Sequence, residues 1–384
     1  MEKFQSKLPQ TGTSIFTVMS QLASQHHALN VGQGFPNFEI DMHLATLVEK
    51  YMRAGKNQYA PMPGVIELRE QIALKISKQY GYSVNHNTEI TITSGATQAI
   101  FTAISALVHP GDEVILFAPA YDCYEPAIQL QGAVPIWIEL SYPDYNIPWQ
   151  EVKAAITPKT KMIIINSPHN PTGKMWSAED IKELESITEE NDLLVISDEV
   201  YEHITFDNRK HESIFKHPKL AARSVGVFSF GKTFHATGWK IGYAVASAEL
   251  MNEFRKVHQY NVFSVNTPVQ YALAEYVMNE EQFLKLPQFY QHLRDNFISK
   301  MTGSNWIFQP AQGAYFQIMD YSRISELPDV EYAKQLVETH KIATIPVSVF
   351  YPHGSHEKLL RICFAKDEST MDRAAEILLN IAST

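Results

Sequence analysis

The sequence has few of the features that mark secreted, membrane-inserted or nucleic-acid-binding proteins. Only two of its 384 residues are cysteine, Cys123 and Cys363, and their wide separation excludes a disulfide framework and a thiolate metal cluster. No apolar stretch approaches the length of a membrane span, and the first residues hold no signal-peptide core. The net charge of −10 offers no basic field for a phosphate backbone. We therefore expect a cytoplasmic protein with no nucleic-acid and no membrane partner.

Other signatures are missing as well. The sequence holds no internal repeat and no low-complexity tract, and its histidines form no H-E-x-x-H pattern, so we predict no metal site. Hydrophobic residues make up 45% of the chain and charged residues 19%, which is the balance of a compact soluble protein. At this length, two domains are expected.

Short apolar runs alternate with amphipathic stretches through the middle of the chain. The runs are rich in Val and Ile and cover residues 89–93, 113–118, 133–138, 161–166, 192–197 and 224–229. Helices are expected between them, at 95–109, 121–131 and 177–190, the last with an N-cap signal at Ser177 and Asp180. This alternation predicts an α/β fold in which a mostly parallel sheet is covered by helices on both faces.

The pattern of predicted strands and helices changes after about residue 268. A long helical region over 268–301, interrupted at Pro287, is followed by shorter elements at 313–321, 329–341, 344–350 and 358–365 and by a closing helix from about Ser369. We predict a large cofactor-binding domain over 42–285 and a small α/β domain over 286–384. The segment 1–41 has no core of its own and is expected to pack on the small domain.

Polar or small residues follow five of the six predicted strands, where an open α/β sheet binds its ligands. They are Gly95, Ala96 and Thr97 after the first run, then Tyr121, Asn170, Asp198 with Tyr201, and Ser229 with Lys232 and the later Lys240. Each one alone has an ordinary explanation as a helix cap, a turn or a surface residue. Their joint occurrence as complementary groups favours a ligand site instead.

Together these residues supply an amine, a carboxylate, a phenol, a carboxamide, an aromatic face and a phosphate cradle, which suits pyridoxal 5'-phosphate. The Lys232 amine would form a Schiff base with the aldehyde, and Asp198 would keep the ring nitrogen protonated. Tyr201 and Asn170 would bind the ring hydroxyl, and Tyr121 would stack on the ring. The phosphate would rest on the N–H groups near Gly95, Ala96 and Thr97, with help from Ser229 and Lys240.

The chain resembles a known family over essentially its whole length. The runs NQYAPMPG, SPHNPTGK, SDEVYEH, SFGKTFHATGWKIGY and RICFA resemble the fold-type I, class I pyridoxal phosphate aminotransferases. QGFPNF, PAYDCYEP and HQYNVFSVNTPVQ are most similar to the methionine and kynurenine aminotransferase branch. The resemblance implies a central sheet of the seven-stranded type and a small domain built from both terminal segments.

The resemblance also implies roles for single residues. Lys232 would carry the cofactor, and Arg361 would bind the substrate α-carboxylate, helped by Asn170 and the backbone at Gly34. Tyr59 of a second subunit would reach the phosphate, which implies an obligate homodimer with a shared active site. Two positions depart from other branches: Lys240 stands where the aspartate branch has arginine, and Tyr121 stands where tryptophan or phenylalanine occurs elsewhere.

The expected reaction moves the α-amino group of an apolar or aromatic amino acid to a 2-oxo acid in two half-reactions. Methionine is the favoured donor, with aromatic amino acids, kynurenine and histidine also open. No second arginine suggests itself for a side-chain carboxylate, and Ile15, Phe16 and Phe35 favour an apolar side chain. A carbon–sulfur β-lyase on the same scaffold is the alternative. A cofactor-binding regulator is disfavoured because no basic DNA-binding module precedes the domain.

Overall fold

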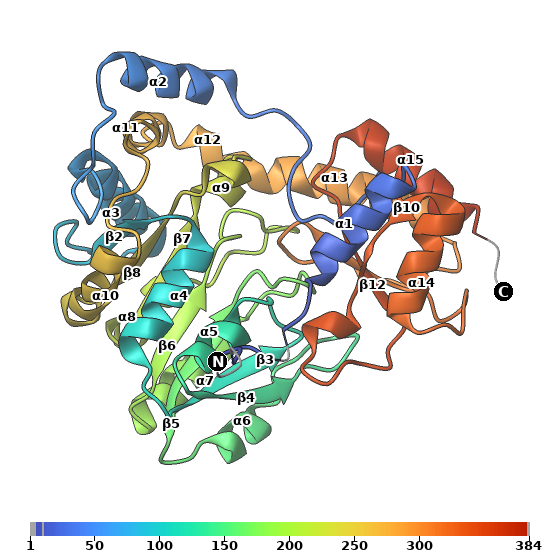
Figure 1. The fold of residues 1–384 in the computed structure, drawn as a ribbon, viewed down its shortest axis with the longest axis horizontal. Helices are drawn as coiled ribbons and strands as arrows, with labels where there is room; N and C mark the ends of the chain where they lie inside the picture. The colour runs from blue at the N-terminus through green and yellow to red at the C-terminus, as the bar shows by residue number, and fades with distance from the viewer. Residues whose placement is uncertain (1–4, 10, 382–384) are drawn as a thin grey trace.

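A seven-stranded sheet lies at the centre of the larger group of elements in this computed structural model, which describes residues 5–9 and 11–381 (Figure 1). Its strand order is β2-β8-β7-β6-β5-β3-β4. The strands are β2 (Ile90–Thr93), β3 (Glu113–Ala118), β4 (Val134–Glu139), β5 (Thr160–Asn166), β6 (Leu194–Asp198), β7 (Ser224–Ser229) and β8 (Gly242–Ala246). Only β8 runs antiparallel to its neighbours, so the other six strands all point the same way. The predicted α/β fold with a mostly parallel seven-stranded sheet is confirmed.

Helices cover both faces of this sheet because apolar residues of the buried strands alternate between two cores. In β5, Met162 and Ile164 pack into one core, and Ile163 and Ile165 pack into the other. The first core includes side chains of α4 (Ala96–Leu107), α5 (Tyr124–Leu130) and α10 (Ala248–Asn261). The second includes side chains of α3 (Ile66–Tyr80), α7 (Ala178–Glu190) and α8 (Pro218–Ala222). The short α6 (Trp149–Ala155) lies beside β4.

The helix signals gave mixed results. The Ser177 hydroxyl accepts from the Asp180 N–H, and the Asp180 carboxylate accepts from the Ser177 N–H, so the predicted N-cap of α7 is a full capping box. The predicted interruption at Pro287 is confirmed to within two residues, because Lys285 separates α12 (Glu281–Leu284) from α13 (Leu286–Met301). Pro287 itself lies in the first turn of α13, where its missing N–H costs no hydrogen bond. A second, longer break lies earlier, between α11 (Thr267–Tyr276) and α12.

A second group of elements lies to the right in Figure 1 and joins both ends of the chain. β9 (Phe316–Asp320), β12 (Leu359–Cys363) and β11 (Ile345–Pro346) form a three-stranded antiparallel sheet. β1 (Leu29–Asn30), which follows α1 (Ile15–Gln25), pairs in parallel with β10 (Ile342–Ala343). The remaining helices are α14 (Asp329–Gln335), which continues as a π turn over Leu336–His340, and α15 (Glu368–Leu379).

Two further points concern the predicted domains. The segment 344–350 is a strand only at β11 and then forms a 3-10 turn over Ser348–Phe350, because the Asp329 carboxylate accepts from the N–H and the hydroxyl of Ser348. The boundaries 1–41, 42–285 and 286–384 stay a prediction, and residues 1–4, 10 and 382–384 of these segments lie outside the described residues.

The antiparallel strand β8 brings its first residues to the same edge where the parallel strands end. Gly242, its first residue, pairs with Ser229 at the end of β7 and with Thr93 at the end of β2. A Cβ on Gly242 would lie 2.5 Å from the Phe228 carbonyl oxygen and 3.1 Å from the Ala96 nitrogen, so only glycine fits at this crossing. The residues just before β8 and the start of α4 are therefore held together at the carboxyl edge of the sheet.

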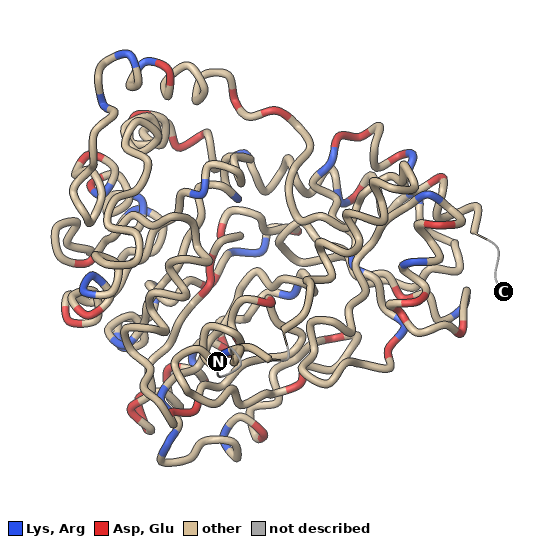
Figure 2. Tube along the Cα trace, in the orientation of Figure 1, with Lys and Arg blue, Asp and Glu red and all other residues tan. Residues whose placement is uncertain are grey.

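The outer surface carries charges of both signs. Figure 2 shows Lys and Arg interspersed with Asp and Glu around the periphery, including the projecting helix α2 (Met42–Arg53), which packs along α11. Among the described residues, no helix combines the length and the apolar character needed to cross a membrane.

Candidate active site

A pocket lies at the carboxyl edge of the large sheet and holds residues from both groups of elements. Most of the predicted site residues line it, namely Gly34, Ala96, Thr97, Tyr121, Asn170, Asp198, Tyr201, Lys232 and Arg361. Gly95, Ser229, Lys240 and Tyr59 are not among the lining residues. The structure thus brings together residues that are up to 327 positions apart (361 − 34) in the chain.

Lys232 lies on the one-turn helix α9 (Phe230–Thr233), directly after β7. The Ser229 hydroxyl caps this turn by accepting from the Lys232 N–H at 3.3 Å. The Lys232 amine donates to the Tyr315 hydroxyl at 3.1 Å and to the Gly34 carbonyl at 3.2 Å. Burial, helped by the nearby cations Lys240 and Arg361, lowers the pKa of Lys232 to about 8. At pH 7 about one tenth of this amine is therefore neutral and nucleophilic, far more than for an ordinary lysine.

Asp198 ends β6, the central strand next to β7, and is 4% exposed. Its carboxylate accepts from the Tyr124 hydroxyl at 2.6 Å and from the Val200 N–H at 3.4 Å. Burial raises the pKa of Asp198 to about 6, although these two hydrogen bonds and the Lys232 charge act in the opposite direction. A buried carboxylate of this kind is suited to a cationic N–H partner, which would return its pKa toward the usual range.

Arg361 and Asn170 meet across the two groups of elements. Arg361 lies on β12 and is 1% exposed, and it donates to the Asn170 carboxamide oxygen at 2.7 Å and to the Gly32 carbonyl at 3.0 Å. The ring of Phe316 lies 4.1 Å from the guanidinium carbon. Burial lowers the pKa of Arg361 to about 10, so the group stays cationic at neutral pH. Its Nε has no hydrogen-bond partner among the described residues, which leaves donor capacity for a ligand.

Gly34 closes the pocket from the N-terminal segment. A Cβ at this position would lie 3.0 Å from the Phe316 ring and 3.9 Å from a terminal nitrogen of Arg361. The backbone at Gly34 therefore lies closer to the Phe316 ring than a larger residue would allow, and it lies beside Arg361.

Two of the three predicted tyrosines, Tyr201 and Tyr121, line the pocket. Tyr201 is buried, and its ring meets the Tyr315 ring edge-on at 5.0 Å. Tyr121 shares a side-chain hydrogen bond with Thr97 and meets Tyr124 edge-on at 5.8 Å. Burial raises the pKa of both phenols, so both stay protonated and can donate hydrogen bonds.

The start of α4 provides donors for an anion. Gly95 is the N-cap residue with φ 78°, and no side chain caps the helix there. A Cβ on Gly95 would lie 3.3 Å from the Lys240 amine, which places that cation beside the first turn. Uncapped N–H groups, the positive end of a helix of 12 residues and a lysine amine together fit a phosphate.

Tyr59 lies away from this pocket. It is 82% exposed, and its ring meets Phe263 edge-on at 5.3 Å. Among the described residues, Tyr59 forms no hydrogen bond, ion pair or ring contact with another predicted site residue. A role in the site therefore requires a second copy of the chain.

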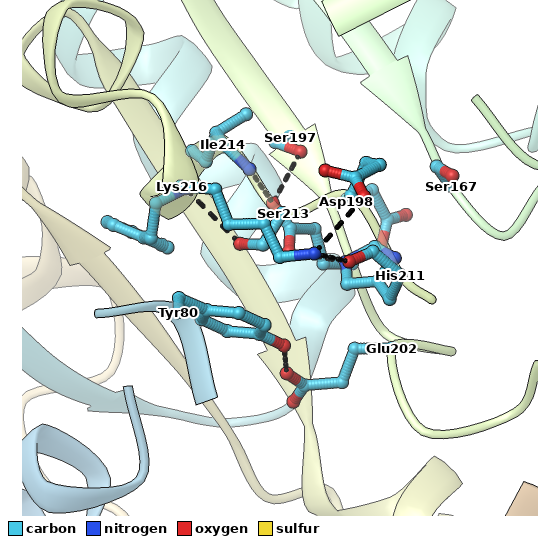
Figure 3. A network of polar contacts seen from close by, with 12 residues as sticks. Tyr80, Ser167, Ser197, Asp198, Glu202, His211, Ser213, Ile214 and Lys216 are labelled. Atoms are coloured by element: carbon cyan, nitrogen blue, oxygen red, sulfur yellow. Dashed lines mark hydrogen bonds and ion pairs between the residues drawn. The ribbon is translucent and has the colours of Figure 1, made fainter. Parts of the chain in front are cut away.

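Sequence reasoning passed over several residues that support the site. Glu199 accepts from the Ser197 hydroxyl at 2.9 Å, from His211 at 2.7 Å and from the Ile214 N–H at 3.2 Å, which fixes the chain directly after Asp198. Figure 3 shows Ser197, His211 and Ile214 gathered beside Asp198.

A second buried carboxylate, Glu202, stabilises the turn after Tyr201. It pairs with Lys75 and accepts from Tyr80, which points at it in Figure 3. The SDEVYEH run carried these two glutamates, but nothing in the sequence indicates that their partners come from α3 and from residue 211.

Tyr124, Tyr315 and Phe316 were also missed as site residues. Tyr124 reads as a packing residue because it lies one turn after Tyr121, and Tyr315 and Phe316 read as the start of a strand. Tyr124 reaches Asp198 from α5, and Tyr315 and Phe316 lie at the start of β9, which belongs to another sheet, and local patterns report neither arrangement.

Comparison with known proteins agrees with this geometry. The chain matches the model for aminotransferase class I and II over residues 27–378. A methionine aminotransferase of Escherichia coli (strain K12) is 48% identical over 375 residues, with 97% of each chain covered. A kynurenine–oxoglutarate transaminase of Dictyostelium discoideum is 34% identical and covers 96% of this chain and 94% of its own.

Solved structures give the same result. A crystal structure from Escherichia coli, described as having a methionine aminotransferase function, matches with a TM-score of 0.96 and 48% identity over 98% of this chain and 99% of that chain. N-succinyldiaminopimelate aminotransferase from Mycobacterium tuberculosis matches with a TM-score of 0.95 and 34% identity over 99% and 100% of the two chains. With its family match, its full-length relatives and its shared fold, this chain belongs to the class I and II aminotransferases, as its motifs predicted.

Proposed function

We propose that the protein transfers the α-amino group of an apolar or aromatic amino acid to a 2-oxo acid, using pyridoxal 5'-phosphate, with methionine as the favoured donor. The observation that carries the proposal is the convergence of Lys232, Asp198 and Arg361 in one pocket. An amine, a carboxylate and a carboxylate-binding guanidinium are the groups that this reaction requires.

The residues present fit the cofactor. Asp198 is buried with a raised pKa and suits the protonated ring nitrogen, while the start of α4 with Lys240 suits the phosphate. Tyr201, Asn170 and Tyr121 line the same pocket, and we assign Tyr201 and Asn170 to the ring oxygen and Tyr121 to the ring face. When bound, the cofactor supplies an aldehyde that holds the amino group between half-reactions and a ring that withdraws electrons from the substrate Cα.

Three residues of the chain would then have separate roles in the reaction. Arg361 holds the substrate α-carboxylate with two parallel hydrogen bonds, and Asn170 and Gly32 keep its guanidinium in place. The Lys232 amine, whose pKa is about 8, removes the proton from Cα and returns it as general base and then acid. Asp198 holds the ring nitrogen in its cationic form through this proton transfer.

The pocket lining supports an apolar or aromatic side chain. Phe16, Phe35 and Ile100 line it, and Arg361 is the only arginine among the lining residues of the described chain. A second carboxylate on the substrate would therefore find no guanidinium partner. Methionine is favoured because the 48% identical relative is a methionine aminotransferase, while aromatic amino acids, kynurenine and histidine remain candidate donors.

The test is a panel of single amino acids mixed with the holoenzyme while the cofactor absorbance is followed. Methionine and aromatic amino acids should change the spectrum without any 2-oxo acid present, and a 2-oxo acid should then restore it. A spectrum that aspartate and glutamate change faster than methionine does would contradict the proposed donor class.

The carbon–sulfur β-lyase alternative is disfavoured because the relatives described above are aminotransferases. It predicts that cystathionine releases ammonia and pyruvate without a 2-oxo acid. The aminotransferase proposal predicts that product from methionine requires one.

A homodimer with a shared site is part of the proposal. Tyr59 is 82% exposed and would complete the phosphate site of a partner chain. Tyr59→Ala and Lys232→Ala homodimers should each be inactive or nearly so. Mixing and subunit exchange should restore up to about one quarter of wild-type activity, because half of the dimers would hold one intact site. Mixtures that stay as inactive as their components would contradict shared sites.

A further inference from the structure

Tyr315 lies between the groups that the proposed reaction uses. It directly precedes β9, is fully buried, and packs its ring against Tyr201 at 5.0 Å and Phe316 at 4.9 Å. Its hydroxyl donates to the Gly34 carbonyl at 2.8 Å and accepts from the Lys232 amine at 3.1 Å. One phenol thus joins the reactive amine on the large sheet to the N-terminal segment beside the carboxylate-binding arginine.

We propose that Tyr315 is a positioning residue that holds the Lys232 amine during proton transfer. This inference rests on the proposed function of Lys232. A carbonyl oxygen cannot donate, so the 2.8 Å hydrogen bond to Gly34 uses the single proton of Tyr315, which also shares a side-chain hydrogen bond with Tyr201. The phenol oxygen is then an acceptor toward Lys232, and it fixes the direction of the amine's N–H groups and therefore of its lone pair.

The phenol cannot itself serve as a base at neutral pH. Burial raises the pKa of Tyr315 well above its ordinary value, and the neighbouring groups Tyr201 and Cys363 raise it further. Tyr315 therefore stays protonated while Lys232 gains and loses a proton. As an acceptor, it stabilises the charged lysine that exists after a proton has been removed from the substrate.

Several charged or titratable groups surround this amine, and each influences its protonation. They are Asp198, Tyr201, Lys240, Tyr315, Arg361 and Cys363. The test must therefore isolate a single hydroxyl and leave these groups unchanged. Tyr315→Phe does so because the ring and its aromatic contacts remain.

Tyr290→Phe is a matched control. The Tyr290 ring lies 5.8 Å from the Tyr315 ring, and Tyr290 is equally buried. Its hydroxyl has no hydrogen-bond partner among the described residues, so its loss changes the same atom in the same cluster without touching Lys232. We expect this variant to match the wild type in every readout below.

The first readout needs no cofactor. In the cofactor-free protein, the pH dependence of Lys232 acylation, mapped by peptide mass spectrometry, should have a midpoint near the pKa of about 8 in the wild type. Loss of the acceptor in Tyr315→Phe should lower this midpoint by about one unit, because the charged form loses a hydrogen bond.

The second readout is the half-reaction of the holoenzyme with methionine. Tyr315→Phe should slow the proton-transfer rate by roughly tenfold and raise the isotope effect of Cα-deuterated methionine, with little change in the methionine concentration for half-saturation. Equal behaviour of the two variants in both readouts would overturn the role of Tyr315. Failure of the wild type to transaminate at all would instead overturn the proposed function, so the two failures are distinguishable.

Discussion

Replacing Arg361 by lysine tests how the protein recognises an α-amino acid. The side chain is buried, and its two terminal nitrogens already donate to Asn170 at 2.7 Å and to Gly32 at 3.0 Å. Its remaining N–H groups form the planar fork that we assign to the substrate carboxylate. A lysine would keep the charge and lose one of two parallel hydrogen bonds.

A hydrogen bond to a charged group contributes about 1.5–3 kcal/mol. Its loss corresponds to a decrease in kcat/KM for methionine of roughly 10- to 100-fold. The assay compares methionine with 3-methylthiopropylamine, the same molecule without its carboxylate, in single-turnover half-reactions. Arg361→Lys should lower the rate for methionine and leave the slow rate for the amine unchanged, so that the ratio of the two rates falls.

Arg294→Lys provides a matched control for this substitution. Arg294 is also a buried arginine, but it bonds Asp207 and the Ala311 carbonyl and does not line the pocket. It should affect stability and leave the methionine-to-amine ratio as in the wild type. If Arg361→Lys keeps that ratio, the guanidinium does not bind the α-carboxylate and the reasoning is refuted.

Three other predictions follow from the buried charges. Asp198→Asn should retain the cofactor on Lys232 and slow the half-reaction by at least about 100-fold in stopped-flow traces, because a neutral amide does not hold the ring nitrogen protonated. In the cofactor-free protein the raised pKa of Asp198 gives stability that is present below about pH 4 and is lost as the pH rises through about 6. Between these pH values the free energy of unfolding of Asp198→Asn should therefore rise relative to the wild type by up to about 3 kcal/mol. Urea unfolding that shows no such pH-dependent gain would contradict the raised pKa. Lys75→Met should lower the free energy of unfolding by about 3–5 kcal/mol, since it leaves Glu202 buried without its ion-pair partner. The double variant Lys75→Met, Glu202→Gln should recover part of that loss. An unchanged urea midpoint in the single variant would contradict this prediction.

Much of the large sheet could be predicted because its strands are short apolar runs with clear ends. The runs at 113–118 and 224–229 match β3 and β7 residue for residue, and the other four differ from their strands by one or two residues at one or both ends. β8 was not located among them. Its residues 242–246 are mostly small and carry a weak strand signal, and it is buried because it runs between β7 and β2.

The part of the pocket formed at strand ends was visible in the sequence for the same reason. Parallel strands bring their carboxyl ends to one edge, so Asn170, Asp198 and Lys232 had to lie close together. Arg361 and Gly34 could be named only by resemblance, because their place depends on how the N-terminal segment and β12 meet the large sheet. Neither the strand ends nor the resemblance indicated Tyr315 as a site residue.

Sodium borohydride reduction of the holoenzyme, followed by proteolysis and mass spectrometry, tests the central claim most directly. The account predicts that the cofactor mass is fixed on the peptide that contains Lys232, and that Lys232→Ala yields no labelled peptide. A label on Lys240 or another lysine, or an unlabelled wild-type protein that still transaminates, would contradict it.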